Sequence, residues 1–201
     1  VESYAAEPSP PNAINEKAIV DSQAVGEAVR RAVKRAGARS RECAVAVSGD
    51  AAITKVIQMP RNLRANELES QVEMQADQYI PFPMEEVSYD FEVIGPSEKD
   101  PEMLDVLLVA TRSENVEQRQ AAVQAAGLTA RIVDVEAFAL ENACRLLTHQ
   151  MPDGGIERSI AVVDFGASST TFSVLRDTKV AYTRDFSFGG QQLTEEIMRT
   201  Y

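Results

Sequence analysis

The sequence predicts a fold in which strands and helices alternate, of the α/β or α+β class with mixed sheets. One observation is that several segments carry apolar residues at helical spacing, with short apolar or alternating segments between them. The other is composition, because 44% of the 201 residues are hydrophobic and 25% are charged. Such a composition supports a sizeable buried core and excludes wholesale disorder.

The first part of the chain should contain one amphipathic helix and three short strands. Asp21 or Ser22 can cap the helix, and Gly37 is placed to end it. The expected strands are 1–6, 43–47 and 53–57.

The next part should contain a second helix followed by a hairpin. Asn66, with Glu69 three residues later, is the expected helix cap, and Pro81 stops the helix. The expected strands of the hairpin are 87–94 and 103–110.

The second half continues the alternation. The expected elements are a helix at 113–126, a strand at 129–135, a helix at 136–149, strands at 159–165, 170–176 and 179–184, and a helix after Gly189-Gly190. Leu147 belongs to the inward stripe of the helix at 136–149. The segment 151–158 contains a proline and two glycines, which is typical of a linker and predicts a domain boundary.

Charge and cysteine content exclude several function classes. The net charge of −11 argues against a nucleic-acid binder and against attraction to an anionic membrane. Cys43 and Cys144 are far apart and form no CxxC or Cys/His cluster, so neither a disulfide framework nor a zinc site is expected. His149 is the single histidine, which excludes a multi-His metal site. No apolar run approaches the roughly 20 residues of a membrane span, so direct membrane insertion is not expected.

The most informative segment is the turn that follows the apolar strand 159–165. Asp164 lies at the end of this strand, and Gly166 and small hydroxyl-bearing residues follow it. Consecutive backbone N–H groups in such a turn can converge on an anion, and Asp164 could hold Mg²⁺ through its water shell. An ordinary hairpin with an aspartate at its tip explains the same residues equally well.

These residues resemble the second phosphate loop of the actin, sugar kinase and heat-shock ATPase superfamily. The segment 188–197 resembles the Gly-Gly-x-x-Leu-Thr helix start of its cell-division and pilus members. Over nearly all 201 residues the chain resembles the PilM family of type IV pilus assembly proteins. The block 79–83, Tyr-Ile-Pro-Phe-Pro, carries this resemblance most specifically, together with Met59-Pro60, Glu67-Leu68, Glu85-Glu86-Val87 and Asp90-Phe91.

The resemblance implies an actin-like ATPase fold. Residues 1–58 and 112–150 would form an incomplete first lobe, and residues 59–111 an inserted subdomain like that of the division protein FtsA. Residues 155–201 would start a second lobe. The chain is then expected to be a segment of a longer protein, cut at both ends.

The resemblance also implies that the full-length protein binds ATP and Mg²⁺. The residues that match the phosphate loop are Asp164, Gly166, Ala167, Ser168, Ser169 and Thr170, with Asp164 facing the metal through water. Ala167 and Ser168 stand where glycines are common and narrow the approach of a phosphate, while Ser169 replaces a threonine and keeps a hydroxyl. Nucleotide binding survives these departures more easily than fast hydrolysis does. We expect at most a weak ATPase, and no tight ATP binding by this segment alone, because it carries one of three parts of the family's site.

As partners, the resemblance implies the cytoplasmic N-terminal tail of PilN, and other proteins of the pilus platform and motor. The protein would be cytoplasmic and held at the inner membrane through these partners. Tyr79, Ile80, Pro81, Phe82 and Pro83 are the candidate partner contacts, at the border of the inserted subdomain. Pure packing at a helix end explains this block about as well.

Two other functions remain open at this point. One is a small-molecule kinase or ATPase of the same superfamily, which turnover by the full-length protein would reveal. The other is a filament protein of cell division like FtsA, which a C-terminal amphipathic membrane helix would mark.

Overall fold

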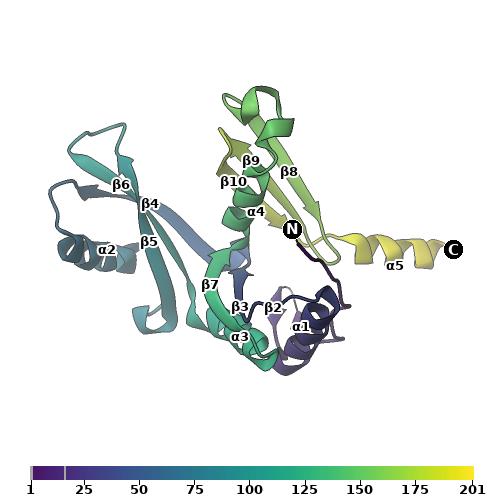
Figure 1. Ribbon diagram of the computed structural model, residues 1–201. Helices are drawn as coiled ribbons and strands as arrows, with labels where there is room; N and C mark the ends of the chain where they lie inside the picture. The colour runs from purple at the N-terminus through teal and green to yellow at the C-terminus, as the bar shows by residue number, and fades with distance from the viewer. Residues whose placement is uncertain (1, 16) are drawn as a thin grey trace. The chain divides into compact units, whose positions relative to one another are not determined.

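The computed structural model describes residues 2–15 and 17–201. It contains two compact units (Figure 1). The smaller unit runs from Ala51 to Glu117, and the larger one comprises the chain up to Asp50 and from Gln118 onward. Each unit has its own sheet and helices, and each is described separately.

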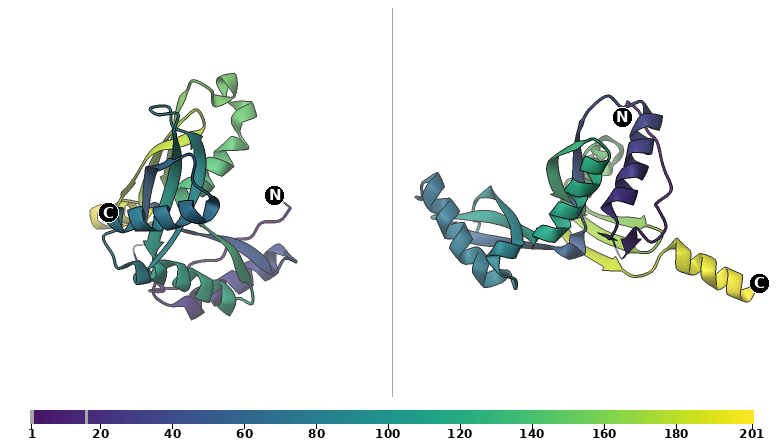
Figure 2. Two further views of the ribbon diagram at one scale, coloured as in Figure 1. Left: turned by 90° about the vertical axis from the view of Figure 1, so that its left-hand side faces the viewer. Right: turned by 90° about the horizontal axis from the view of Figure 1, so that it is seen from below.

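The smaller unit is a three-stranded antiparallel sheet with one helix across a face (Figure 2). Its strands are β4 (Ala52–Pro60), β5 (Val87–Pro96) and β6 (Met103–Arg112), in the order β4-β6-β5. The helix α2 (Ala65–Tyr79) contributes its apolar stripe to a core whose members are Ile57, Met59, Val72, Ala76, Ile80, Val87, Val106, Leu108 and Ala110. A short 3-10 turn, Met84–Glu86, leads from the helix into β5.

The smaller unit starts earlier than residue 59, the expected boundary of the inserted subdomain. β4 pairs with β6 without interruption from Ala52, opposite Thr111, to Pro60, opposite Met103. The strand expected at 53–57 therefore belongs to this unit and not to the first lobe.

The start of α2 also differs from the expectation. The helix begins at Ala65, so Asn66 lies inside it and is not its cap. Glu67, not Glu69, reaches back to the helix start, where its carboxylate accepts a hydrogen bond from the backbone N–H of Arg64 at 2.8 Å. The helix ends before Pro81, as expected.

The larger unit contains a parallel pair of strands, β3 (Glu42–Val47) and β7 (Thr129–Val135). The helices α1 (Ser22–Ala36) and α3 (Ser113–Ala125, from Gln118 onward in this unit) pack closely, because a Cβ atom at Gly26 would lie 2.5 Å from the carbonyl oxygen of Ala122. Their apolar residues meet those of the strands in a second core around Val123, Ala126 and Leu128.

A second sheet in the larger unit is antiparallel, with the order β10-β9-β8 (Figure 1). Its strands are β8 (Ser159–Phe165), β9 (Thr170–Arg176) and β10 (Lys179–Phe186), followed by the helix α5 (Gly190–Thr200). The turn between β9 and β10, Asp177-Thr178, has two positive φ angles, 51° and 64°, as a tight hairpin turn requires. These residues, expected to start a second lobe at 155, lie in the same compact unit as β3 and β7.

In the larger unit, one expected strand is wrong and one expected helix ends earlier than predicted. Residues 2–6 form no strand, and Val1 lies outside the described residues; the first strands are the short pair β1 (Ile14–Asn15) and β2 (Ala18–Ile19). The helix expected at 136–149 is α4 (Glu136–Arg145), which is followed by the 3-10 turns Thr148–Gln150 and Pro152–Gly155. Leu147 lies beyond its end and is 48% exposed instead of facing inward.

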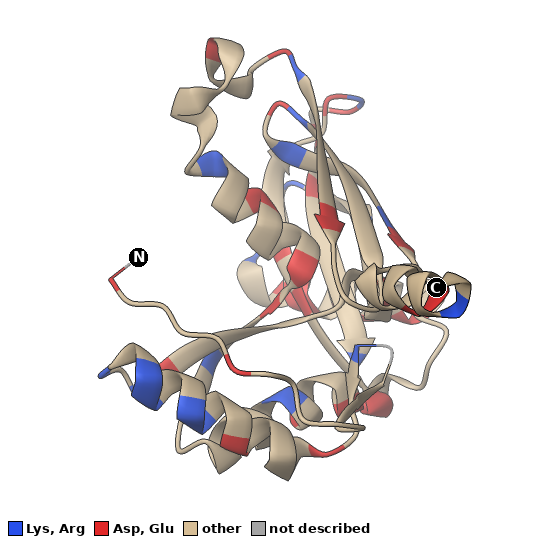
Figure 3. Ribbon diagram, turned by 90° about the vertical axis from the view of Figure 1, so that its right-hand side faces the viewer, with Lys and Arg blue, Asp and Glu red and all other residues tan. Residues whose placement is uncertain are grey.

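Ion pairs tie the N-terminal segment to α1. Figure 3 shows where basic and acidic residues lie along the ribbon. The carboxylate of Glu7 pairs with Arg31 at 3.4 Å and with Arg35 at 2.7 Å. Part of the basic face of α1 therefore serves an internal contact. In the part of the chain that the structure describes, no helix has the length and apolar character to cross a membrane.

Candidate functional site

A cavity of about 360 Å³ lies within the larger unit. Its walls come from the chain between β1 and β2, the 3-10 turn that follows β3, the first half of α4, and the sheet β8–β10 with the loop between β8 and β9. The lining residues are Lys17, Gly49, Glu136, Ala137, Leu140, Asp164, Gly166, Ser169, Thr171, Ser173, Thr183 and Asp185. Most of them are polar, which distinguishes this cavity from an apolar packing defect.

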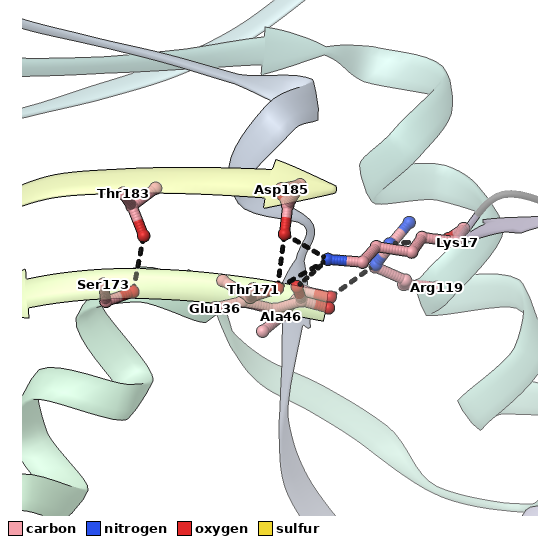
Figure 4. Close-up of polar contacts among 8 residues, drawn as sticks. All are labelled: Lys17, Ala46, Arg119, Glu136, Thr171, Ser173, Thr183 and Asp185. Carbon is pink, nitrogen blue, oxygen red and sulfur yellow. Dashed lines mark hydrogen bonds and ion pairs between the residues drawn. The ribbon is translucent and has the colours of Figure 1, made fainter. Parts of the chain in front are cut away.

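The sheet presents a polar face to the cavity because of its register. Asp164, Thr171 and Asp185 are cross-strand neighbours on β8, β9 and β10, so their side chains share one face. The Thr171 hydroxyl donates to the Asp185 carboxylate, and the hydroxyls of Ser173 and Thr183 hydrogen-bond one row further on (Figure 4). The sheet thus delivers carboxylates and hydroxyl groups to one wall.

The predicted phosphate loop reaches this cavity with three of its six residues. Asp164, Gly166 and Ser169 line it, whereas Ala167, Ser168 and Thr170 do not. The hydroxyl of Thr170 is used elsewhere, since it donates to the carbonyl of Phe188 at 2.6 Å. The Thr170 side chain therefore stabilises the loop, and its predicted contact with a nucleotide stays a prediction.

The loop is joined to the start of α5 by backbone hydrogen bonds. The N–H groups of Gly190 and Gln191 donate to the carbonyls of Gly166 and Ala167, at 2.9 and 2.8 Å. This close approach requires glycine, because a Cβ atom at Gly189 would lie 2.6 Å from both carbonyl oxygens. In the Gly-Gly pair identified in the sequence, Gly189 thus allows the loop to approach the helix, and Gly190 hydrogen-bonds to it.

The loop keeps backbone donors that the fold does not use. Gly166 N–H donates to the carbonyl of Ser169 at 3.0 Å, which closes the turn. No acceptor among residues 2–15 and 17–201 pairs with the backbone N–H groups of Ala167, Ser168 and Ser169. Successive donors of this kind, next to small side chains, suit an anion.

Lys17, which sequence reasoning missed, is held at the cavity by three oxygens. Its Nζ lies 3.0 Å from Asp185 Oδ1, 3.3 Å from Glu136 Oε2 and 3.3 Å from Thr171 Oγ1 (Figure 4). Burial alone would lower the pKa of Lys17, but the two carboxylates outweigh it and raise the pKa above its ordinary value of 10.5. The ammonium group therefore stays charged at neutral pH.

Arg119, on α3, supports this arrangement from below the surface. Its Nε donates to the carbonyl of Ala46, and its Nη2 donates to the carbonyl of Lys17 at 3.3 Å (Figure 4). The residue is 8% exposed, and burial lowers the pKa of its guanidinium, opposed by Glu136 and Asp50. Arg119 thus fixes the backbone of Lys17 to β3.

The charges around the cavity bear on what it can hold. Among the described residues that line the cavity, three carry carboxylates, Glu136, Asp164 and Asp185, and Lys17 carries an ammonium group. The described residues contain no group of three or more His, Cys, Asp or Glu side chains arranged to hold a metal ion. This donor set fits Mg²⁺, which keeps most of its waters and takes few protein carboxylates, better than a metal that needs a full protein cage.

The block 79–83 in the smaller unit divides into buried and exposed side chains. Ile80 is 5% exposed and belongs to the core, so it is not available to a partner, contrary to the expectation. Phe82 is half-buried against the same core, with the Arg112 guanidinium carbon 4.9 Å from its ring centre. Tyr79, Pro81 and Pro83 are exposed, and Lys55 Nζ lies 5.7 Å from the centre of the Tyr79 ring.

Comparison with known proteins gives a family and related structures. A sequence profile described as type IV pilus assembly protein PilM matches residues 1–201. A chain of the solved PilM-PilN type IV pilus biogenesis complex matches with 30% identity and a TM-score of 0.80, over 100% of this chain and 58% of that chain. This match confirms the expected fold class.

Two further structures are more distant. The ethanolamine utilization protein EutJ from Carboxydothermus hydrogenoformans has 18% identity and a TM-score of 0.48, over 94% of this chain and 45% of that chain. A Bacteroides thetaiotaomicron protein of unknown function with an actin-like ATPase fold has 7% identity and a TM-score of 0.39, over 87% of this chain and 60% of that chain.

Proposed function

Since the chain belongs to the PilM family of type IV pilus assembly proteins, we propose that it is part of a scaffold of the pilus assembly platform. In this proposal the full-length protein binds a nucleotide with Mg²⁺ in the larger unit and the cytoplasmic tail of PilN through the smaller unit. It is cytoplasmic and held at the inner membrane by protein partners. The solved PilM-PilN complex supports the choice of PilN, and the chain spans 58% of the matched chain's length.

The observation that carries the nucleotide proposal is the meeting of the predicted loop with the cavity. Asp164, Gly166 and Ser169 line a space of about 360 Å³, and the backbone N–H of Ser169, which no described residue accepts, could donate to a phosphate oxygen there. Asp164 would hold Mg²⁺ through water, and the bound ion would neutralise phosphate charge. Ala167 and Ser168, in place of glycines, narrow the approach of a phosphate, which nucleotide binding survives more easily than fast hydrolysis does.

The nucleotide proposal is tested by Asp164→Ala in the full-length protein. We expect the variant to lose the Mg²⁺-dependent part of its ATP affinity and to keep any metal-independent part, because the carboxylate acts through the metal. Isothermal titration with ATP, with Mg²⁺ and with EDTA, measures both parts. Asp77→Ala, an exposed aspartate on α2, is the matched control. An unchanged Mg²⁺ dependence in Asp164→Ala would count against the assignment.

The partner proposal rests on the exposed part of the block 79–83. Tyr79 keeps 43% of its surface exposed at the end of α2, and Pro81 and Pro83 stiffen the exposed chain beside it. An exposed aromatic side chain on a rigid support loses little entropy when a peptide covers it. A short tail could therefore use Tyr79 as an anchor, with Phe82 contributing from its half-buried position.

The partner proposal is tested by comparing Tyr79→Ala with Phe82→Ala. Tyr79→Ala should weaken binding of a PilN tail peptide by about 1–3 kcal/mol with little change in melting temperature. Phe82→Ala should lower both affinity and melting temperature, because its ring packs on the core. Met74→Ala, which removes a 64% exposed side chain from the same helix, is the control. Unchanged peptide affinity in both aromatic variants would show that the block 79–83 serves packing and does not bind the partner.

A further inference from the structure

Lys17 occupies a backbone position that is unfavourable for a lysine. It directly precedes β2 and has a φ of 67°, in the left-handed region that favours glycine. The Arg119 guanidinium, which donates to its carbonyl at 3.3 Å, holds it in this conformation. The register pairs Asn15 with Ala18, and so short a connection between strands requires positive φ angles; Arg119 then fixes the point from which the Lys17 side chain starts.

The Lys17 side chain is directed into the proposed nucleotide cavity. It is 19% exposed, and its Nζ contacts Glu136, Asp185 and Thr171, all of which line the cavity (Figure 4). Of the described residues in the cavity wall, Lys17 alone carries a positive charge. A lysine ammonium has three donors on a flexible stem, so it can exchange one set of oxygens for another with a small movement.

The charge balance of the cavity indicates what would draw Lys17 away from its carboxylates. Glu136, Asp164 and Asp185 exceed the charge of Lys17 by two negative units. A free polyphosphate is repelled by this excess, whereas a divalent cation bound to the polyphosphate neutralises part of the phosphate charge and attracts the carboxylates. The carboxylates then have a second cation to face, and the phosphate oxygens compete for the ammonium group.

We propose that Lys17 contacts the terminal phosphate of the bound nucleotide, and that it exchanges Asp185 and Glu136 for this phosphate when the metal-bound nucleotide enters. The inference rests on the proposed nucleotide function and deepens it, since it names a residue that distinguishes ATP from nucleotides with fewer phosphates. Arg119 is a positioning residue, because it holds the Lys17 backbone and not the ligand.

The test measures affinities for Mg-ATP, Mg-ADP and AMP in the full-length protein by isothermal titration. Lys17→Met should lower the affinity for Mg-ATP about tenfold or more and leave that for AMP nearly unchanged. Asp185→Asn should keep or raise the affinity for Mg-ATP, because it removes a competitor for the ammonium group. Lys179→Met, at the exposed start of β10, is the control and should bind like the wild type.

Other outcomes would overturn the inference in recognisable ways. Lys17→Met with wild-type affinity for Mg-ATP would exclude the phosphate contact while leaving the nucleotide proposal intact. If Lys17→Met lost equal affinity for all three nucleotides, the ion pair would be purely structural. The same would follow if Lys17→Met and Asp185→Asn lost equal affinity for Mg-ATP and both had a lower melting temperature. Absence of Mg-ATP binding by the wild type would overturn the nucleotide proposal and this inference with it. If Lys17→Met does not fold, Lys17→Gly replaces it, because glycine suits the positive φ.

Discussion

Gly189 and Gly190 are adjacent residues with different steric surroundings. A Cβ atom at Gly189 would lie 2.6 Å from the carbonyl oxygens of Gly166 and Ala167, whereas one at Gly190 would meet nothing closer than 3.8 Å. We therefore expect Gly189→Ala to lower the free energy of unfolding by about 1–3 kcal/mol, because the loop must shift. Gly190→Ala should change it little. Urea unfolding of both variants measures the difference, and equal effects would contradict the steric explanation.

At the residue scale, the sequence predicted the local half of the candidate site. Asp164, Gly166 and Ser169 belong to one strand, turn and strand, so their chemistry is visible in a single segment. Lys17 lies 119 positions from Glu136 and 168 positions from Asp185, its two ion-pair partners. No local spacing rule links such positions, because the fold alone brings them together.

At the scale of single elements, α1 is a helix whose two ends are both encoded locally. The Asp21 carboxylate accepts a hydrogen bond from the backbone N–H of Ala24 at 2.9 Å, and Gly37 ends the helix with a φ of 69°. Asp21→Ala should lower the free energy of unfolding by about 1 kcal/mol, since it leaves a helix N–H unsatisfied. Denaturant unfolding checks this value, with Glu27→Ala in the exposed middle of α1 as control. If Asp21→Ala lowered the free energy of unfolding no more than the control does, water would be satisfying the Ala24 N–H group in place of the Asp21 carboxylate.

Two elements, β4 and α2, were predicted correctly in type but not at their ends, and the reasons differ. β4 continues to Pro60 because β6 offers a partner along its whole length, and a proline is tolerated at the end of an edge strand. α2 starts at Ala65 because Glu67 satisfies the N–H of Arg64, a pattern that Asn66 and Glu69 imitate two positions later. In both cases the periodicity predicted the element and its type. The partner strand β6 sets the length of β4, and a hydrogen bond within its own first turn sets the start of α2.

At the scale of the whole molecule, the smaller unit has the properties of an independent folding unit. All strands of its sheet lie within 51–117. The core on the helix-covered face of the sheet includes Met59, Val72 and Leu108, each fully buried. We expect a protein of residues 51–117 to unfold cooperatively, as followed by circular dichroism in urea. Leu108→Ala should lower its free energy of unfolding by about 2–5 kcal/mol, and Val56→Ala, 54% exposed, should have a much smaller effect. A non-cooperative transition of the isolated unit would show that its core needs the rest of the chain.

The hydrogen bonds between the loop after β8 and the first turn of α5 couple the movements of the two segments. Two backbone hydrogen bonds, from Gly190 and Gln191 to the carbonyls of Gly166 and Ala167, make the loop and the first turn of the helix one rigid part. A displacement of Gly166 toward or away from the cavity must either break these bonds or carry the N-terminus of α5 with it. Because the helix is rigid over its 11 residues, a small tilt at its first turn becomes a larger movement at Tyr201. A change in the position of Gly166 that keeps these hydrogen bonds would therefore be amplified along α5.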